Sequence, residues 1–171
     1  MVPGSRIAWV ARGIVDNTPN LPATGSPDGG GFFSHASGAE NGLSDVVAPL
    51  NSLIGVFLTD ATPDISPAPA ALDFSTIGTD YSLLSPELKQ VFFMGDGVDS
   101  QGDIQCVVVP AGATRLFLGT MDGFGWYNNS GSFDVTLSIK PNPVIPEASP
   151  WAASVATLGL AGFSRLRRRR M

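Results

Sequence analysis

The sequence predicts an all-β fold, and three of its features support that prediction. Charged residues form only 15% of the 171 residues, whereas glycine and proline occur 20 and 14 times, a composition typical of short strands joined by tight turns. Almost no stretch has the apolar spacing of a long amphipathic helix. Residues 130–139 instead alternate, so that one face carries Phe133, Val135, Leu137 and Ile139. We expect this segment to be a half-buried strand.

The other elements are expected in the following order along the chain. Residues 6–15 form a strand with a break at Gly13, and residues 16–42 form a long loop rich in Pro, Gly, Ser and Asn. We then expect a buried strand at 53–59, a Pro-rich crossing at 60–80, a helical turn at 85–90 capped by Ser85, and strands at 90–95, 104–110 and 114–120. Strands with long connections favour a jelly-roll-like β-sandwich.

The charge of the chain is unevenly distributed. The net charge is −5, but five of the eight arginines lie at 165 and 167–170, so residues 1–164 carry 5 basic and 15 acidic side chains, a balance of −10. A body of that charge repels nucleic acid and suits cations or neutral ligands, although most of its carboxylates could equally be solvated surface groups.

Catalysis has little support in the sequence. His35 is the only histidine, which makes Ser-His-Asp chemistry and histidine-rich metal sites hard to assemble. Cys106 is the only cysteine, and its place in the strand at 104–110 predicts a buried small hydrophobe. We therefore expect a protein that is not an enzyme.

The composition changes after Ile139. Residues 140–149 form a Pro-rich linker. Residues 150–164 carry no charge, and five arginines follow them. Although a bilayer core needs about 20 apolar residues, flanking arginines can extend a shorter run. We expect one hydrophobic membrane helix and an Arg cluster at 150–171, with the arginines on the cytoplasmic side.

This tail resembles the PEP-CTERM sorting signal, in which a Pro-Glu-Pro motif precedes a short membrane segment and terminal arginines. The matching residues are Pro146, Glu147, Ala148 in place of the second proline, Arg165, Arg167, Arg168, Arg169 and Arg170. The resemblance implies recognition by an exosortase, transient anchoring in the inner membrane, and delivery to the cell envelope or extracellular matrix. Such a signal accompanies a secretory peptide, and since residues 1–15 do not look like one, we expect the true start to lie upstream.

The stretch "TMDGFGWYNNSGSF" (120–133) offers a set of oxygen ligands. Asp122, Asn128 and Asn129 lie in a glycine-containing loop, where neighbouring asparagines can point at one ion as they cannot on a strand. Carboxylate and amide oxygens are what calcium prefers. From the residues alone, a loop whose asparagines bond their own backbone is favoured over a calcium site. The carboxylates of "GDGVDSQGD" (95–103) suggest a second calcium loop only faintly, and a solvated hairpin explains them better.

The same stretch resembles the calcium and sugar site of the bacterial galactophilic lectins, and the likeness extends at low identity over residues 3–139. It implies a galactose-binding-like sandwich over 1–139 that lacks its first strand. Calcium would be held by Asp122, Asn128 and Asn129, by the Gly125 carbonyl and by one near Asn17. Asn41, Asp122 and Asn128 would contact the sugar. Trp126 or Tyr127 could offer a sugar ring an apolar face, and for each of them packing in the core is an equal interpretation. The spacer after Asp122 is one residue shorter than in the family, and Gly38 replaces its sugar-binding histidine, with His35 nearby.

Together these features predict an exported, non-enzymatic, calcium-dependent carbohydrate-binding protein that takes galactose-like sugars or exopolysaccharide. The alternative is a structural envelope or matrix protein of the same fold, in which calcium only stiffens the last loop.

Overall fold

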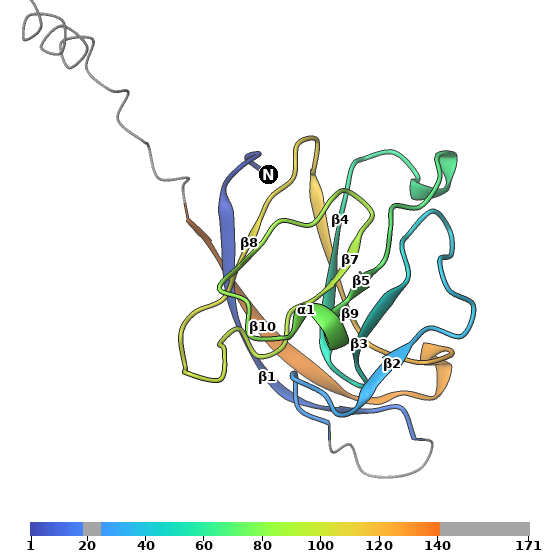
Figure 1. The fold of residues 1–171 in the computed structure, drawn as a ribbon, viewed down its shortest axis with the longest axis vertical. Helices are drawn as coiled ribbons and strands as arrows, with labels where there is room; N and C mark the ends of the chain where they lie inside the picture. The colour runs from blue at the N-terminus through green and yellow to red at the C-terminus, as the bar shows by residue number, and fades with distance from the viewer. Residues whose placement is uncertain (19–24, 141–171) are drawn as a thin grey trace, which may run out of the picture.

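A computed structural model describes residues 1–18 and 25–140 of the chain. Strand is the main regular structure, at 42%, and it is accompanied by two short 3₁₀ turns and one short helix (Figure 1). The elements are β1 (Arg6–Asp16), β2 (Phe32–Ser34), β3 (Val46–Pro49), β4 (Leu53–Leu58), η1 (Pro63–Ile65), β5 (Leu72–Asp73), α1 (Phe74–Ile77), β6 (Leu83–Leu84), β7 (Val91–Phe93), β8 (Cys106–Val108), β9 (Arg115–Thr120), η2 (Trp126–Asn128) and β10 (Ser130–Lys140).

Three sheets make up the fold. One has the strand order β10-β1-β8-β6, the second β2-β3-β5 and the third β7-β4-β9. Most neighbours are antiparallel, while β3 with β5 and β6 with β8 are parallel. This arrangement agrees with the predicted all-β sandwich. The expected strands at 6–15, 53–59, 90–95, 104–110 and 114–120 correspond to β1, β4, β7, β8 and β9.

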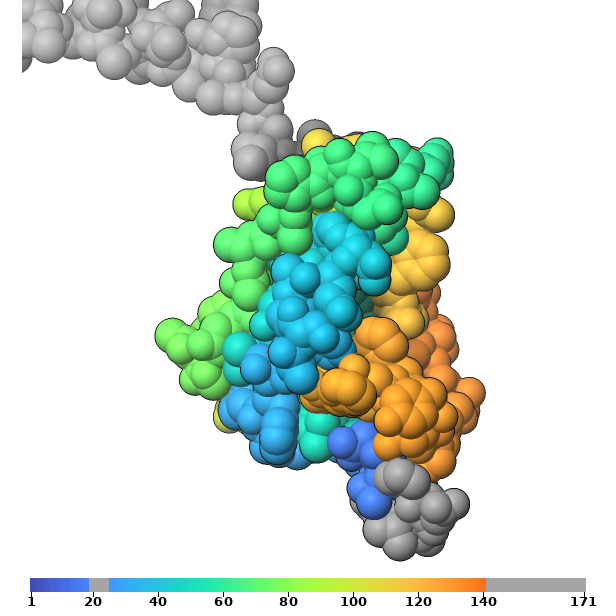
Figure 2. All heavy atoms as spheres, turned by 90° about the vertical axis from the view of Figure 1, so that its right-hand side faces the viewer, coloured from blue at the N-terminus to red at the C-terminus, as the bar shows by residue number. Residues whose placement is uncertain are grey.

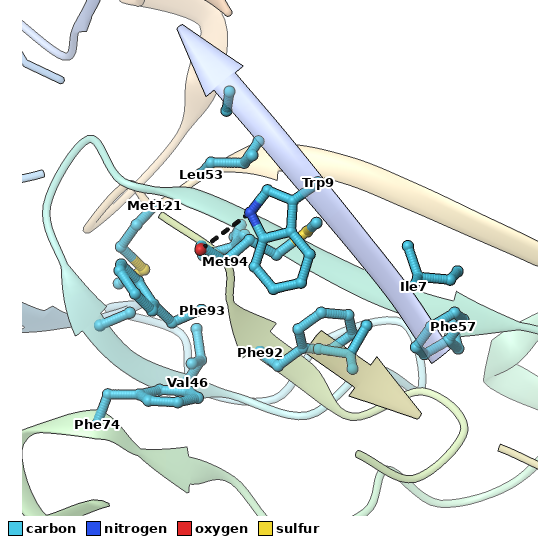
Figure 3. Close-up of a cluster of buried hydrophobic side chains, with 14 of the residues drawn as sticks. Ile7, Trp9, Val46, Leu53, Phe57, Phe74, Phe92, Phe93, Met94 and Met121 are labelled. Atoms are coloured by element: carbon cyan, nitrogen blue, oxygen red, sulfur yellow. Dashed lines mark hydrogen bonds between the residues drawn. The ribbon is translucent and has the colours of Figure 1, made fainter. Parts of the chain in front are cut away.

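The core lies between these sheets and is rich in aromatic side chains (Figure 3). Phe57 and Phe92 stack at 5.4 Å between ring centroids, and Phe74 packs against Phe93 at 5.8 Å. Trp9 of β1 is 2% exposed, and its indole N–H donates to the carbonyl of Met94 at 3.2 Å. Burying each such side chain contributes about 1.5–3 kcal/mol, so these rings hold the four-stranded sheet against β4 and β7.

The longest pairing in the molecule joins β1 to β10 over all eleven residues, from Arg6 opposite Lys140 to Asp16 opposite Ser130. The predicted break at Gly13 does not interrupt it. Gly13 has φ +116°, and a Cβ there would lie 2.3 Å from the Ser132 carbonyl oxygen, so only glycine lets the strand pass at this point. This antiparallel pairing places the end of β1 beside the start of β10.

One sequence prediction about local structure is wrong, and one short helix was not predicted. Residues 85–90 contain no helical turn, because Lys89 has φ +67° and the chain turns there to enter β7. The short helix α1 lies instead in the expected Pro-rich crossing, where the Asp73 side chain accepts the Ser75 N–H and caps it.

The alternation of β10 is present, but its burial is uneven. Phe133 and Val135 pack against the core, whereas Leu137 and Ile139 are 42% and 65% exposed. β10 is the outer strand of its sheet, so no further strand in the described part of the chain covers its last residues. The predicted half-buried strand is therefore half-buried only over its first part.

Candidate functional site

The loop between β9 and β10 carries most of the predicted ligands. It begins at Asp122, a 5% exposed carboxylate whose Oδ1 accepts the backbone N–H groups of Phe124 at 2.7 Å and Gly125 at 3.1 Å. These charge-assisted bonds turn the chain directly after the strand. η2 follows, and the Asn129 N–H donates to the Trp126 carbonyl at 3.2 Å, which closes the loop before β10.

The end of β1 reaches the same loop. There the Asp16 carboxylate accepts the Thr18 N–H at 2.8 Å and turns the chain at Asn17. The Asn17 carbonyl accepts a hydrogen bond from Asn128 Nδ2 at 3.1 Å, across 111 positions of sequence. The full-length pairing of β1 with β10 explains this contact, because it fixes the residue after β1 beside the residues before β10.

Four of the five predicted calcium ligands line one cavity of about 200 Å³: Asn17, Asp122, Gly125 and Asn128. Phe33 and Leu50 form part of its wall, and the Tyr127 ring, 85% exposed, stands beside it. The cavity is thus built from four segments that are distant in sequence, around Asn17, Phe33, Leu50 and the β9–β10 loop. A half-turn of the Asn128 amide would present Oδ1 rather than Nδ2 to a cation shared with the Asn17 carbonyl.

The fifth predicted ligand, Asn129, is placed differently. It does not line this cavity, and its Nδ2 donates to Thr120 Oγ1 at 3.4 Å. Neighbouring residues in the turn point apart here, because Asn129 is already at the junction with β10. A ligand role for Asn129 would therefore require its side chain to move.

Several oxygens around this loop are buried without a hydrogen-bond partner. They include Asp122 Oδ2 and Asn129 Oδ1, and also Asn51 Oδ1, Ser52 Oγ and Ser130 Oγ. The two segments involved are tied together through Met121, which bonds to the backbone of Asn51 and Ser52 at 2.8 Å each. Buried oxygens of this kind cost free energy unless a donor, a water or a cation satisfies them. Of these five residues, Asp122 is the one that lines the cavity.

The predicted sugar contacts gather on the other side of Asp122. Asn41, Asp122 and Trp126 line a second cavity of about 260 Å³, whereas Asn128 lies only on the first. Asp122 borders both. Trp126 is 59% exposed, and its indole N–H donates to the Thr120 carbonyl at 2.8 Å, which fixes the ring at the edge of the cavity.

His35 also belongs to this site, although the family register does not place it there. Its Nε2 lies 2.9 Å from the Phe124 carbonyl, and its ring stacks on Trp126 with 6.2 Å between ring centroids. Its Nδ1 lies 3.8 Å from the Glu40 carboxylate. Together with the Ala36 N–H, which donates to the Gly123 carbonyl at 2.8 Å, these contacts join the loop after β2 to the β9–β10 loop. In Figure 2 these two segments lie side by side, in blue and orange.

The acidic stretch 95–103 is a hairpin turn in the structure. Asp99 Oδ1 accepts the N–H groups of Gln101 and Asp103 at 2.9 Å each, so this carboxylate caps the turn. The pKa of Asp28, which faces the hairpin, is raised, mainly because the carboxyl is partly buried. The hydrogen bond from the Asp96 N–H lowers this pKa, and the negative charge of Asp96 raises it. Within residues 1–18 and 25–140, no three His, Cys, Asp or Glu side chains are grouped to hold a metal ion.

The predicted sorting signal and membrane helix lie outside the described residues. This applies to Pro146, Glu147, Ala148, Arg165, Arg167, Arg168, Arg169 and Arg170. In the part of the chain that the structure does describe, no helix has the length and apolar character of a membrane crossing.

Comparisons with protein-family models, with curated proteins and with solved structures gave no match to this chain.

Proposed function

We propose that this chain is a non-enzymatic, calcium-dependent carbohydrate-binding protein with a jelly-roll-like, galactose-binding-like sandwich. The observation that carries the proposal is the cavity at the β9–β10 loop. The residues that the lectin resemblance nominated from the two ends of the chain, Asn17, Asp122, Gly125 and Asn128, line it together. At its wall, the buried Asp122 Oδ2 has no hydrogen-bond partner.

In this proposal Asp122 supplies the negative charge and the other ligands are neutral oxygens. Its Oδ1 holds the loop through two N–H groups, which leaves Oδ2 for the ion. A bound calcium ion would take neighbouring sugar hydroxyls in place of coordinated water. The chain's own contribution to sugar binding is then Asn41 as a hydrogen-bonding side chain and the Trp126 ring as an apolar face.

Export and sorting by the C-terminal tail complete the proposal. An exosortase would recognise the segment around Pro146 and Glu147, and the tail would anchor the protein in the inner membrane before delivery to the envelope or the extracellular matrix. The acidic balance of residues 1–164 argues against a nucleic-acid partner. Galactose-like sugars or exopolysaccharide are the proposed ligands.

One observation favours the alternative, a structural protein in which calcium only stiffens the loop. The cavity joins the end of β1, the Phe33 and Leu50 segments and the β9–β10 loop, and a cation bound to Asn17 and to the loop would crosslink two of them. Both functions predict that calcium raises the melting temperature. Only the first predicts a further rise on adding sugar.

The test is a thermal melt of the full chain in detergent, with chelator, with calcium, with galactose, and with both. We expect galactose to raise the melting temperature only when calcium is present, and Asp122→Ala to abolish both effects. Asp99→Ala is the matched control, since it removes a turn-capping carboxylate from the hairpin away from the cavity. A calcium response without any response to a panel of sugars would favour the structural protein, and no calcium response would reject both.

A further inference from the structure

We infer that two copies of this chain pair through β10, edge to edge and antiparallel, about a two-fold axis at Leu137. The inference does not depend on the proposed calcium and sugar site. It comes from the free side of β10, because in the described part of the chain this strand pairs only with β1 (Figure 1). The unpaired N–H and C=O groups of an eleven-residue edge form a template for another strand.

The backbone groups on the free side belong to the odd-numbered residues of β10. In β1, the N–H groups of Ala11 and Val15 donate to loop carbonyls on the side away from β10. Because backbone groups alternate along a strand, β1 bonds to β10 through its even-numbered residues. These lie opposite even-numbered residues of β10, as Val10 lies opposite Thr136. The N–H and C=O groups of the odd-numbered residues of β10 therefore point outward.

The side chains of the last odd-numbered residues are apolar and exposed. Leu137 and Ile139 lie opposite Trp9 and Ile7 of β1, whose side chains are buried in the core (Figure 3). Leu137 and Ile139 are nevertheless 42% and 65% exposed. The buried row thus ends at β10, and another strand beside it would extend the row and cover both side chains.

Charge complementarity selects a second copy and its register. The polar face of β10 carries two exposed charges, Asp134 and Lys140. Arg12 lies opposite Asp134 in the sheet, but within the described residues neither Asp134 nor Lys140 forms an ion pair. In an antiparallel pair about Leu137, Asp134 of one copy lies opposite the partner's Lys140. The two-fold axis repeats this contact, so the dimer contains two such pairs, and moving the axis by one residue removes both.

The same register also matches the apolar side chains and the backbone. Val135 lies opposite the partner's Ile139, and Leu137 lies opposite its own copy, so these odd-numbered residues exchange the outward hydrogen bonds. Nothing within β10 blocks such pairing. The strand contains no proline, carries no charge among its odd-numbered residues, and pairs residue for residue with β1 without a bulge.

The dimer should be weak, because strand pairing over residues 134–140 buries less surface than the about 1,200 Å² of a stable interface. We therefore expect an equilibrium that depends on protein concentration, with a dissociation constant in the micromolar range. Added salt should shift it towards the monomer, since the two charge pairs lie on the exposed face.

The experiment is sedimentation velocity of the full chain in density-matched detergent over a concentration series. We expect a monomer–dimer equilibrium for the wild type and loss of the dimer for Leu137→Lys, which places a charge in the paired edge. Val10→Lys is the matched control, because it puts the same charge at a half-exposed apolar position of β1, away from the free edge. Lys140→Glu should weaken the dimer about tenfold by opposing Asp134 twice, and Lys140→Arg should not.

Disulfide mapping tests the register with Leu137 intact. In the proposed pairing Thr136 lies opposite the partner's Ser138, within the Cα separation that a disulfide allows, whereas the two copies of Thr136 are offset along the strands. With the free cysteine removed by Cys106→Ser, a mixture of Thr136→Cys and Ser138→Cys should form a disulfide-linked dimer. Either variant alone should not.

Several results would overturn the inference. They are a monomer at every concentration, a dimer that survives Leu137→Lys, and crosslinking that does not require the mixture of the two cysteine variants. Hydrogen exchange identifies another occupant of the edge, because protected N–H groups of Leu137 and Ile139 in a monomer would mean that a segment of the same chain pairs there. None of these results bears on the calcium and sugar site, which the thermal melts test.

Discussion

Replacing Asp122 by asparagine separates its two roles. In the structure, Oδ1 holds the loop through the N–H groups of Phe124 and Gly125, while Oδ2 is buried without a partner. An asparagine can keep Oδ1 in place and accept both bonds, so the fold of the loop is preserved. What it loses is the negative charge, and the atom facing the proposed ion becomes the amide NH₂, a donor that cannot bind a cation.

The expected magnitudes differ between the two conditions. Without calcium, Asp122→Asn should cost less than about 1 kcal/mol in the free energy of unfolding, whereas Asp122→Ala loses two bonds to a charged acceptor, each worth about 1.5–3 kcal/mol at most. With calcium at about 100 times the dissociation constant, the wild type gains about 2.7 kcal/mol. A variant with about hundredfold weaker binding gains only about 0.4 kcal/mol at the same concentration.

The assay is a urea melt of wild type, Asp122→Asn and Asp122→Ala, each with chelator and with a calcium series. In temperature, a difference of about 2.3 kcal/mol in calcium-dependent stability corresponds to about 5–9 °C for a chain of this size. Magnesium is the control ion, since it demands a tighter octahedral shell than these loop oxygens provide. Full calcium stabilisation of Asp122→Asn would refute the ligand role. An equal loss for the Asn and Ala variants in chelator would refute the hydrogen-bonding role of Oδ1.

Three further predictions concern the fold around the site. Asp28→Asn should become more stabilising as pH rises above about 4, because the raised pKa of Asp28 means that the folded state resists ionisation there; urea melts across pH test this, and a flat difference would contradict it. Tyr81→Phe removes the donor to the Phe93 carbonyl and should cost about 1 kcal/mol. Burial raises the pKa of Tyr81, so an alkaline absorbance titration should show this phenol ionising only as the fold opens, a step that the variant lacks. Gly42→Ala should cost more than Gly38→Ala, since both have positive φ but only the Cβ at 42 would meet the Pro63 carbonyl oxygen, at 2.0 Å; equal losses in chemical denaturation would contradict this.

The strands were predictable where the pattern is local. The alternation of residues 130–139 and the apolar run at 53–59 predicted the strands β10 and β4. Successive side chains of a strand point to opposite faces, so a half-buried strand shows an alternating pattern in its sequence. The exposure of Leu137 and Ile139 was not predictable, since it depends on β10 being the outermost strand of its sheet. Sheet order is a property of long-range pairing and leaves no periodic signal in the sequence.

The prediction of a helical turn at 85–90 was wrong for a different reason. Ser85 and Pro86 are good starting residues for a helix, so the local sequence does favour a helical turn. In the structure this segment leads from β6 into β7. Lys89 has a left-handed backbone conformation, and its N–H donates to the Phe57 carbonyl at 2.8 Å. A tertiary bond thus overrides the local preference.

The candidate site shows the same division. The residue types alone left the Asp122 loop open between a cation site and a self-bonded turn, and the lectin resemblance nominated it together with Asn17. The register of β1 with β10 explains why both line one cavity. The sequence assigned His35 no role, yet it contacts the Phe124 carbonyl and the Trp126 ring. These contacts depend on the loop after β2 folding against the β9–β10 loop, which no local pattern in the sequence shows.

The contacts of the β9–β10 loop also bear on the choice between a sugar-binding and a purely structural protein. The loop is held by the Asp122 carboxylate, by the closing bond from Asn129 to Trp126, and by the packing of His35. A loop that needed calcium in order to fold would lose conformational entropy on binding, and that cost would reduce the affinity. Because the chain's own groups supply these contacts, most of the effect of a cation would be to supply coordination positions beside the Trp126 ring. Rigid positioning of a site with room next to it favours ligand binding over a structural crosslink.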